Sequence, residues 1–322
     1  NIALCEFQEP ADSAAMTDTQ RSSGAGLVVA GGLLMGTLGL FLEQAGQHPL
    51  TAVFFRCLFG GAALLAYALA TGRLKELRPT RQGMTVAALT GSLMVVMWAS
   101  FFAAIQWTSI ALATVTFHLQ PLWLLLAGTW LLGERLGLAR ALGVFGAFAG
   151  LTMATGLLHA GLPAGQQLFA WGLALAVLGA VCYAAVSLLA QRQRALSSLG
   201  LTFWQCATGT LLLAWWPAWR GLPAQWGGWP AATWGWLVGL GVLHTGLAYA
   251  LIYAGMQRLE VGRIALLQFI YPMAAITLDV AIYGRALDGM QWAGVLLMGA
   301  ALWWAGRADA VRPLATRGVQ SG

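Results

Sequence analysis

PLWLLLAGTWLLG (residues 121–133) and PMAAITLDVAIYG (residues 272–284) are two apolar stretches that begin with proline, end with glycine and lie 151 residues apart. The same offset places residues 82–158 on residues 233–309 without a gap. Identical residues coincide at this offset, among them Gln106 with Gln257, Pro121 with Pro272, Gly133 with Gly284, and Gly143 with Gly294. Aromatic rings recur at matching positions as well. The chain therefore contains an internal repeat.

The composition indicates an integral membrane protein. Hydrophobic residues make up 59% of the chain and charged residues 9%, whereas an ordinary soluble domain has roughly 25% charged residues. A length of 322 residues leaves room for about ten helices of about 20 residues each with short loops. We therefore expect no separate soluble domain.

Long apolar segments separated by polar residues predict ten membrane-spanning helices. They lie near residues 27–44, 50–71, 83–107, 110–132, 137–158, 168–190, 199–217, 234–256, 261–283 and 290–306. The segments are apolar on all sides, while strands of a membrane β-barrel alternate apolar and polar residues, so helices are favoured. The predicted fold is an all-α integral membrane protein.

The repeat divides these spans into two groups of five. Because an odd number of spans separates equivalent positions, the second copy is expected to be inverted in the bilayer, an arrangement typical of alternating-access transporters. The predicted organisation is a disordered N-terminal segment 1–26, a first five-helix repeat 27–158, a periplasmic linker 159–167, a second five-helix repeat 168–306 and a basic tail 307–322.

The distribution of basic residues predicts the orientation. If the N-terminus is cytoplasmic, fourteen of the 17 Lys and Arg residues lie in cytoplasmic segments, while Arg220 and Arg285 lie in outer loops and Arg56 lies within a span. We therefore expect a bacterial inner-membrane protein with both termini in the cytoplasm. The net charge of +6 follows from this topology and from attraction to anionic lipid headgroups, and nucleic acid is not an expected partner.

One motif resembles a known transporter repeat. The segment from His118 through Pro121 to Gly133-Glu134, followed by Gly143 and two further glycines, is similar to the EamA repeat of the drug/metabolite transporter superfamily. A second copy runs from Tyr271-Pro272 to Gly284, with Arg285 where that repeat usually has Glu. The resemblance covers residues 27–306 and implies two five-helix halves. The richness in Trp resembles YddG-type aromatic amino acid exporters.

Depth in the membrane selects the candidate substrate-binding residues, since the sites of inverted-repeat transporters lie near the bilayer midplane. Counting about 1.5 Å of rise per residue from the span ends gives hydrogen-bonding groups and rings suited to a small, partly apolar metabolite. Any one of these rings can equally serve only for packing. The candidates are Trp98, Ser100, His118, Gln120, Trp123, Tyr183, Trp204, His244, Tyr249, Gln268 and Tyr271.

Two prolines and three charges complete the set of intramembrane candidates. Pro121 and Pro272 occupy equivalent mid-span positions, where proline removes a helical hydrogen bond, and they are interpreted as static kinks or as paired hinges. Glu43, Arg56 and Asp279 are buried charges in the outer leaflet. We expect Arg56 to form an ion pair with Asp279 or Glu43, which is also a candidate outer gate.

These features favour a secondary transporter over the alternatives. No metal-ligand spacing, paired midplane aspartates or Ser/His dyad supports an intramembrane enzyme, and neither a metal nor another cofactor is expected. The repeat and the mid-span prolines favour alternating access over a channel or a scaffold. The predicted function is export of small metabolites, aromatic amino acids above all, by a monomer, and the alternative is a broader metabolite or drug permease. The lipid bilayer is the other partner.

Overall fold

The computed structural model describes residues 18–134, 137–160, 169–284 and 286–310. All regular structure in these residues is helical, and none of them lies in a strand. The predicted linker 159–167 and tail 307–322 fall largely outside these residues, and so do Arg285 and residues 1–17 of the predicted N-terminal segment. The all-helical class that the sequence predicts is confirmed for the part of the chain that is described.

The first half of the chain forms helices that follow the predicted segments. They are α1 (Asp18–Gly36), α2 (Leu38–Ala45), α3 (Pro49–Ala70), the 3₁₀ turn η1 (Leu74–Leu77), α4 (Arg81–Trp107), α5 (Ile110–Phe117), α6 (Gln120–Leu132), α7 (Leu138–Ala154) and α8 (Leu157–Ala160). The prediction that residues 18–26 are disordered was wrong, because α1 begins at Asp18, well before the apolar segment. Polar residues extend this helix beyond its apolar part.

The second half repeats the pattern with one irregular segment. Its helices are α9 (Phe169–Arg192), α10 (Ser198–Leu213), α11 (Trp215–Trp219), α12 (Ala231–Gly239), the π-helical segment η4 (Leu240–Leu247), α13 (Ala248–Met256), α14 (Val261–Leu267), α15 (Ile270–Tyr283) and α16 (Gly289–Ala310). Helices α12, η4 and α13 are continuous along the chain. A π-helical turn within a longer helix is often found at a functional site.

Seven helical segments are long and apolar enough to cross a bilayer by length and composition. They are Ser22–Ala45, Pro49–Ala70, Arg81–Trp107, Ile110–Leu131, Phe169–Arg192, Ala231–Met256 and Val261–Tyr283. Helix α7 is a shorter apolar helix. The chain is therefore a multi-pass membrane protein.

The two stretches that reveal the repeat become helices of the same design. Pro121 lies in the first turn of α6, where its missing N–H has no intrahelical partner to lose. Gly133 ends α6 with φ +63°, and Gly284 ends α15 with φ +61°. This left-handed conformation suits glycine, which has no Cβ. Proline and glycine thus begin and end the equivalent helices in both copies.

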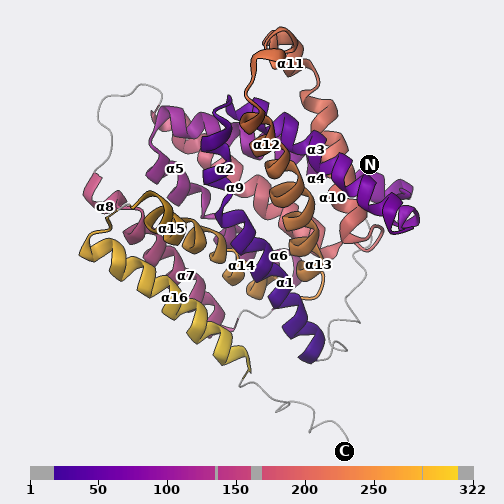
Figure 1. The fold of residues 1–322 in the computed structure, drawn as a ribbon. Coiled ribbons are helices and arrows are strands. Elements are labelled where there is room, and N and C mark those ends of the chain that lie inside the picture. The colour runs from indigo at the N-terminus through magenta and orange to yellow at the C-terminus, as the bar shows by residue number, and fades with distance from the viewer. Residues whose placement is uncertain (1–17, 135–136, 161–168, 285, 311–322) are drawn as a thin grey trace, which may run out of the picture.

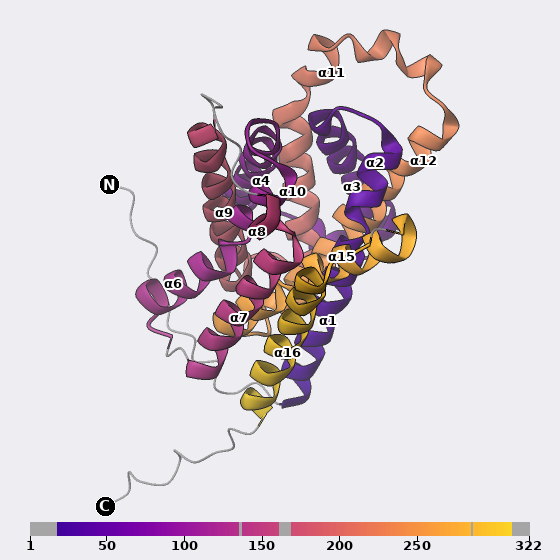
Figure 2. The same cartoon turned by 90° about the vertical axis from the view of Figure 1, so that its left-hand side faces the viewer.

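Helices of the two halves are interleaved. Helix α7 packs along α16, α4 along α9, α1 along α13 and α15, and α3 along η4 and α10. Figures 1 and 2 show α7 and α16 side by side at one edge of the bundle. Most of the hydrophobic core therefore lies between the two halves and not within either of them.

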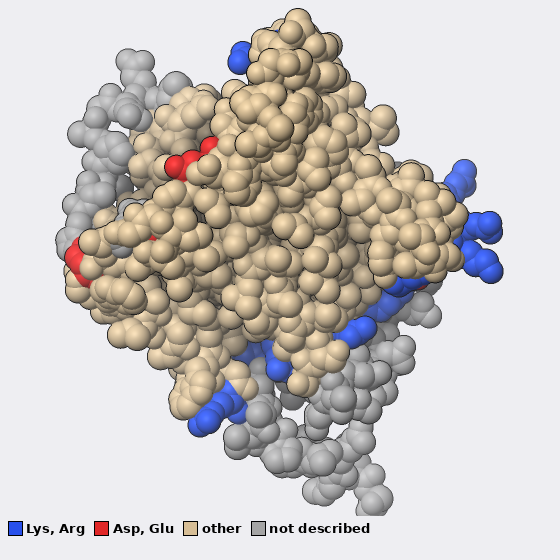
Figure 3. All heavy atoms as spheres, in the orientation of Figure 1, with Lys and Arg blue, Asp and Glu red and all other residues tan. Residues whose placement is uncertain are grey.

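Lys and Arg side chains are concentrated at one end of the bundle. Figure 3 shows Lys and Arg along the lower rim, at the end where α1 begins and α16 ends, and an uncharged belt above it. The segment around α11 lies at the opposite end and carries Arg220. A wide uncharged belt is what a lipid-facing surface requires.

Candidate functional site

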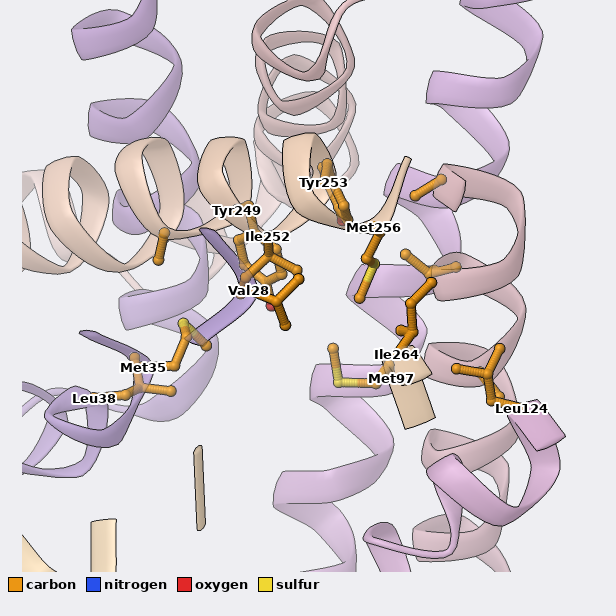
Figure 4. Packing of buried hydrophobic residues seen from close by; sticks show 14 of the residues in the cluster. Val28, Met35, Leu38, Met97, Leu124, Tyr249, Ile252, Tyr253, Met256 and Ile264 are labelled. Atoms are coloured by element: carbon orange, nitrogen blue, oxygen red, sulfur yellow. The ribbon is translucent and has the colours of Figure 1, made fainter. Parts of the chain in front are cut away.

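A cavity of about 90 Å³ lies where helices of the two halves meet. Seven of the eleven predicted site residues line it: Trp98, His118, Gln120, Tyr183, Tyr249, Gln268 and Tyr271. Figure 4 shows part of its wall, where Val28 and Met35 of α1 lie close to Tyr249 and Ile252 of α13. The lining is mainly aromatic and apolar, with a few hydrogen-bonding groups.

The lining follows the internal repeat. Five pairs of lining residues are related by the offset of 151: Gly32 and Tyr183, Trp98 and Tyr249, Phe101 and Ile252, Phe117 and Gln268, and Gln120 and Tyr271. Equivalent positions of the two copies thus contribute to the lining of one cavity. The two residues of each pair differ in chemical type. The positions that line the cavity are therefore repeated, while the side chains at those positions are not.

Breaks in two helices place polar side chains at the cavity. Helix α5 ends at Phe117 and α6 begins at Gln120, so the span is interrupted at His118 and Leu119. In the second half α14 ends at Leu267 and α15 begins at Ile270. Irregular backbone at membrane depth is tolerated only where protein buries it or a cavity adjoins it. The two breaks meet through the stacked rings of His118 and Tyr271, whose centroids are 5.9 Å apart.

His118 presents a hydrogen-bond acceptor to the cavity. Its Nδ1 lies 2.7 Å from the carbonyl oxygen of Thr114, and because a carbonyl can only accept, Nδ1 carries the proton. In the neutral ring, Nε2 is then an acceptor. Nε2 is buried and has no partner among the described residues. A buried unpaired acceptor is costly, so a ligand with an N–H or O–H group would relieve it.

Two glutamine side chains carry further unpaired acceptors. Gln268 donates its Nε2–H to Ser187 Oγ at 3.0 Å, and its Oε1 is left without a partner. The Oε1 of Gln120 is also buried and unpartnered. Together with His118, these side chains give the cavity three hydrogen-bond acceptors that no described group satisfies.

Arg56 lies directly behind one wall of the cavity. It is 2% exposed, and its Cζ atom is 4.4 Å from the centre of the Trp98 ring. Its Nε–H donates to Thr245 Oγ1 at 2.9 Å, and an Nη2–H points to the carbonyl of His244 at 3.5 Å. Nη1 has no partner among the described residues. The guanidinium is therefore held by neutral groups.

The predicted ion pair of Arg56 with Glu43 or Asp279 was wrong. Ion pairs form elsewhere among the described side chains, between Arg73 and Glu76 and between Arg140 and Glu260. Glu43 is exposed and lies beside Tyr283 at the C-terminal end of α15, and Asp279 is close to the same tyrosine. The side chain of Arg56 instead points towards η4 and Trp98, where no carboxylate of the described chain reaches it.

Four predicted residues lie outside the cavity lining. Trp123 is 39% exposed on the bundle surface. Trp204 donates its Nε1–H to the carbonyl of Leu77 in η1 at 2.8 Å. Ser100 and His244 are buried but do not reach the cavity. Counting residues along a span gives depth, but it does not give the direction in which a side chain points around the helix.

Several lining residues were not predicted. They include Phe101, Thr114 and Phe117, together with Val28, Gly32, Met97, Ile252, Met256 and Leu267. The internal repeat and the helical spacing could have predicted two of them. Phe117 is the equivalent of the predicted Gln268, and Phe101 follows Trp98 by three residues, on the same face of α4.

Polar contacts join the two halves near the start of α14. Glu134 Oε2 accepts a hydrogen bond from the Val261 N–H at 3.1 Å, and Arg140 pairs with Glu260. Burial and the neighbouring Glu260 carboxylate raise the pKa of Glu134 above its usual range. These contacts connect the ends of α6 and α7 with the start of α14.

Comparison with known proteins identifies the class. Residues 22–156 and 170–307 each match the EamA-like transporter family. An uncharacterized transporter, YxxF, of Bacillus subtilis (strain 168) is 26% identical over 287 residues, which cover 88% of this chain and 89% of that protein. An uncharacterized transporter of Archaeoglobus fulgidus is 28% identical over 288 residues, covering 87% of this chain and 96% of that protein.

The fold is also shared with a solved structure. A crystal structure with 24% sequence identity superimposes with a TM-score of 0.75 and covers 90% of this chain and 98% of its own. An all-helical multi-pass bundle with two matched halves is the architecture of a membrane transporter. The chain belongs to the EamA-like transporter family of the drug/metabolite transporter superfamily.

Proposed function

We propose that this protein exports small amphipathic metabolites by alternating access, with aromatic amino acids as its best substrates. The observation that carries this proposal is the cavity, whose rings surround three unpaired acceptors. Rings suit an aromatic side chain, since each aromatic pair contributes about 0.5–1.5 kcal/mol beyond burial. The acceptors suit an ammonium group. YddG-type aromatic amino acid exporters, which the Trp-rich sequence resembles, are the corresponding narrower class.

The proposed architecture is ten spans in two inverted repeats. Two matches to one family and five lining pairs related by a constant offset support the repeat. Each predicted span coincides with a helix or a series of consecutive helices. Five spans per copy would invert the second copy, so that equivalent residues approach the cavity from opposite membrane faces.

The size of the cavity favours a protein that changes conformation. A volume of about 90 Å³ holds about three water molecules, since each occupies about 30 Å³ in the liquid, whereas a cavity that binds benzene measures about 150 Å³. An aromatic amino acid therefore requires a wider state than the one described. The contacts of Glu134 and Glu260 join the two halves in this state, and in the proposed mechanism they break when that end of the bundle opens.

The proposed location is the bacterial inner membrane, with both termini in the cytoplasm and the chain acting as a monomer. Lys75 in η1 and Gln225 in the α11–α12 loop are both exposed, and this topology places them on the cytoplasmic and the outer side of the membrane, respectively. With Cys5 replaced by serine, an impermeant maleimide should label Gln225→Cys in intact spheroplasts and Lys75→Cys only after permeabilisation. The parent without an introduced cysteine is the control. Labelling of both variants in intact spheroplasts would contradict this topology.

Substrate competition tests the proposed function. Uptake of labelled phenylalanine is measured in proteoliposomes that contain the purified protein. Unlabelled phenylalanine, tryptophan, alanine and glutamate are added as competitors. We expect the two aromatic amino acids to compete at least about tenfold better than alanine, because stacking and burial of a ring contribute more than about 1.4 kcal/mol. Equal competition by alanine and phenylalanine, or none by any amino acid, would reject aromatic amino acid export.

A broader metabolite or drug permease is the second candidate. Three methionines, Met35, Met97 and Met256, line the cavity, and flexible methionine side chains are typical of surfaces that accept varied ligands. If this function is the correct one, planar apolar cations without a carboxylate will compete as well as phenylalanine does in the same assay.

A further inference from the structure

Arg56 is a buried charged group that has no counter-ion among the described residues. It lies in the membrane-spanning helix α3 and is 2% exposed. An arginine side chain stays protonated in proteins, and an unpaired charge inside a membrane protein is costly. The groups in contact with the guanidinium are the Trp98 ring, the Thr245 hydroxyl and the His244 carbonyl. None of them carries a negative charge.

The guanidinium also has N–H donors that are not used in short hydrogen bonds. Nη1 has no partner among the described residues, and the contact from Nη2 to the His244 carbonyl is long, at 3.5 Å. Only the Nε–H makes a short hydrogen bond, with Thr245. A guanidinium presents its N–H groups in a planar fork that matches the two oxygens of a carboxylate.

Trp98 separates this fork from the cavity. Its ring contacts the guanidinium, at 4.4 Å from Cζ, and also lines the cavity wall. A cation over an aromatic face is attracted by the ring, so Trp98 holds Arg56 in the absence of an anion. The cavity must widen to admit a ligand, and a movement of the Trp98 side chain would join the guanidinium to it.

The unpaired acceptors belong to other elements. His118 lies at the break between α5 and α6, and Gln268 at the break between α14 and α15, whereas Arg56 belongs to α3. The site therefore has its acceptors on the broken helices and its cationic donor behind Trp98. Groups of opposite kind on separate elements suit a ligand with an ammonium group and a carboxylate.

We infer that Arg56 binds the carboxylate of the transported molecule once the Trp98 side chain moves aside, which makes a negatively charged group a requirement for tight binding. This inference rests on the proposed function and specifies its substrate class. The unmatched acceptors bind the opposite, hydrogen-donating end. In the described state the Trp98 ring takes the place of the carboxylate against Arg56.

Three probes with a common ring test this inference on the full-length protein in detergent. They are phenylalanine, phenethylamine, which lacks the carboxylate, and 3-phenylpropionate, which lacks the ammonium group. Binding is measured as displacement of labelled phenylalanine. For the parent protein we expect phenethylamine to bind about 10- to 100-fold more weakly than phenylalanine, as expected for loss of a hydrogen-bonded charge pair. This comparison needs no variant.

Variants then assign the effect to Arg56. Arg56→Gln should weaken phenylalanine and 3-phenylpropionate by about 10- to 100-fold and leave phenethylamine unchanged. Arg56→Lys keeps the charge without the fork and should retain part of the preference. Size-exclusion profiles show that each variant is folded.

Three results would overturn the assignment. If phenethylamine binds the parent as tightly as phenylalanine does, the carboxylate is not recognised, although aromatic amino acid transport can still stand. If Arg56→Gln weakens all three probes equally, Arg56 has only a structural role beside η4. If no probe binds the parent, the inference fails together with the proposed function.

Discussion

Gly150→Ala and Gly294→Ala should each prevent stable folding. A Cβ added at Gly150 would lie 2.6 Å from the carbonyl oxygen of Gly294 and 2.8 Å from the amide nitrogen of Met298. A Cβ added at Gly294 would lie 2.5 Å from Gly150 O and Ala154 N. These neighbours are backbone atoms that no side-chain rotation can move, so α7 and α16 would have to separate along their whole contact.

Each substitution should lower the free energy of unfolding by about 3 kcal/mol or more, at the upper end of the range for overpacked sites. The measurement is the yield of monodisperse protein and its midpoint of thermal unfolding in detergent. Gly299→Ala is the matched control, since Gly299 lies on the same helix α16 and an added Cβ meets no atom within 4 Å. That variant should be as stable as the parent. Equal stability of Gly294→Ala and Gly299→Ala would show that the α7–α16 approach is looser than described.

Pro121→Ala and Pro272→Ala should slow transport at least about tenfold while substrate affinity stays close to that of the parent. Proline costs about 3 kcal/mol relative to alanine in a helix interior, and about 1.4 kcal/mol is a factor of ten in an equilibrium. Alanine supplies the N–H that proline lacks. The break between α5 and α6, or between α14 and α15, can then close into a continuous helix, and the conformational change loses its hinge.

Pro49→Ala is the control for this pair. Pro49 also lies in a first helical turn, that of α3, but a loop precedes it after α2 ends at Ala45. No break between two parts of one span can close there, so the substitution should leave transport unchanged. Rates are measured as initial uptake into proteoliposomes, and affinities by displacement in detergent. Parent-like transport rates in both mid-span variants would show that the two prolines are static kinks.

The sequence predicted the helices and much of the cavity wall for a physical reason. Apolar runs must be about 20 residues long to cross a bilayer, so their positions are legible without a structure. The shared offset then located Trp98, Tyr249 and Tyr271 at similar depths. The disordered N-terminal segment was predicted incorrectly at residues 18–26, because polarity alone does not distinguish a solvated helix from a disordered chain.

The partners of side chains could not be predicted in the same way. Trp98 and Trp123 both lie at mid-span by residue count, yet one lines the cavity and the other is 39% exposed. Direction around the helix axis decides between them, and helices that are apolar on all sides give little periodic signal for it. Arg56 was expected to meet a carboxylate, but its hydrogen-bond partners come from η4, which no sequence pattern marked.

The five repeat-related pairs in the cavity wall bear on the resting state of the transporter. If the two copies were identical and inverted, exchanging their conformations would turn an inward-open protein into an outward-open one of equal free energy. Their differences remove that degeneracy. Gly32 is the counterpart of Tyr183 and Gln120 the counterpart of Tyr271 at the offset of 151, and the tyrosine hydroxyls of the cavity lining all belong to the second copy. In the proposed inverted architecture, the unlike residues at related positions would therefore set which side of the membrane the empty protein faces.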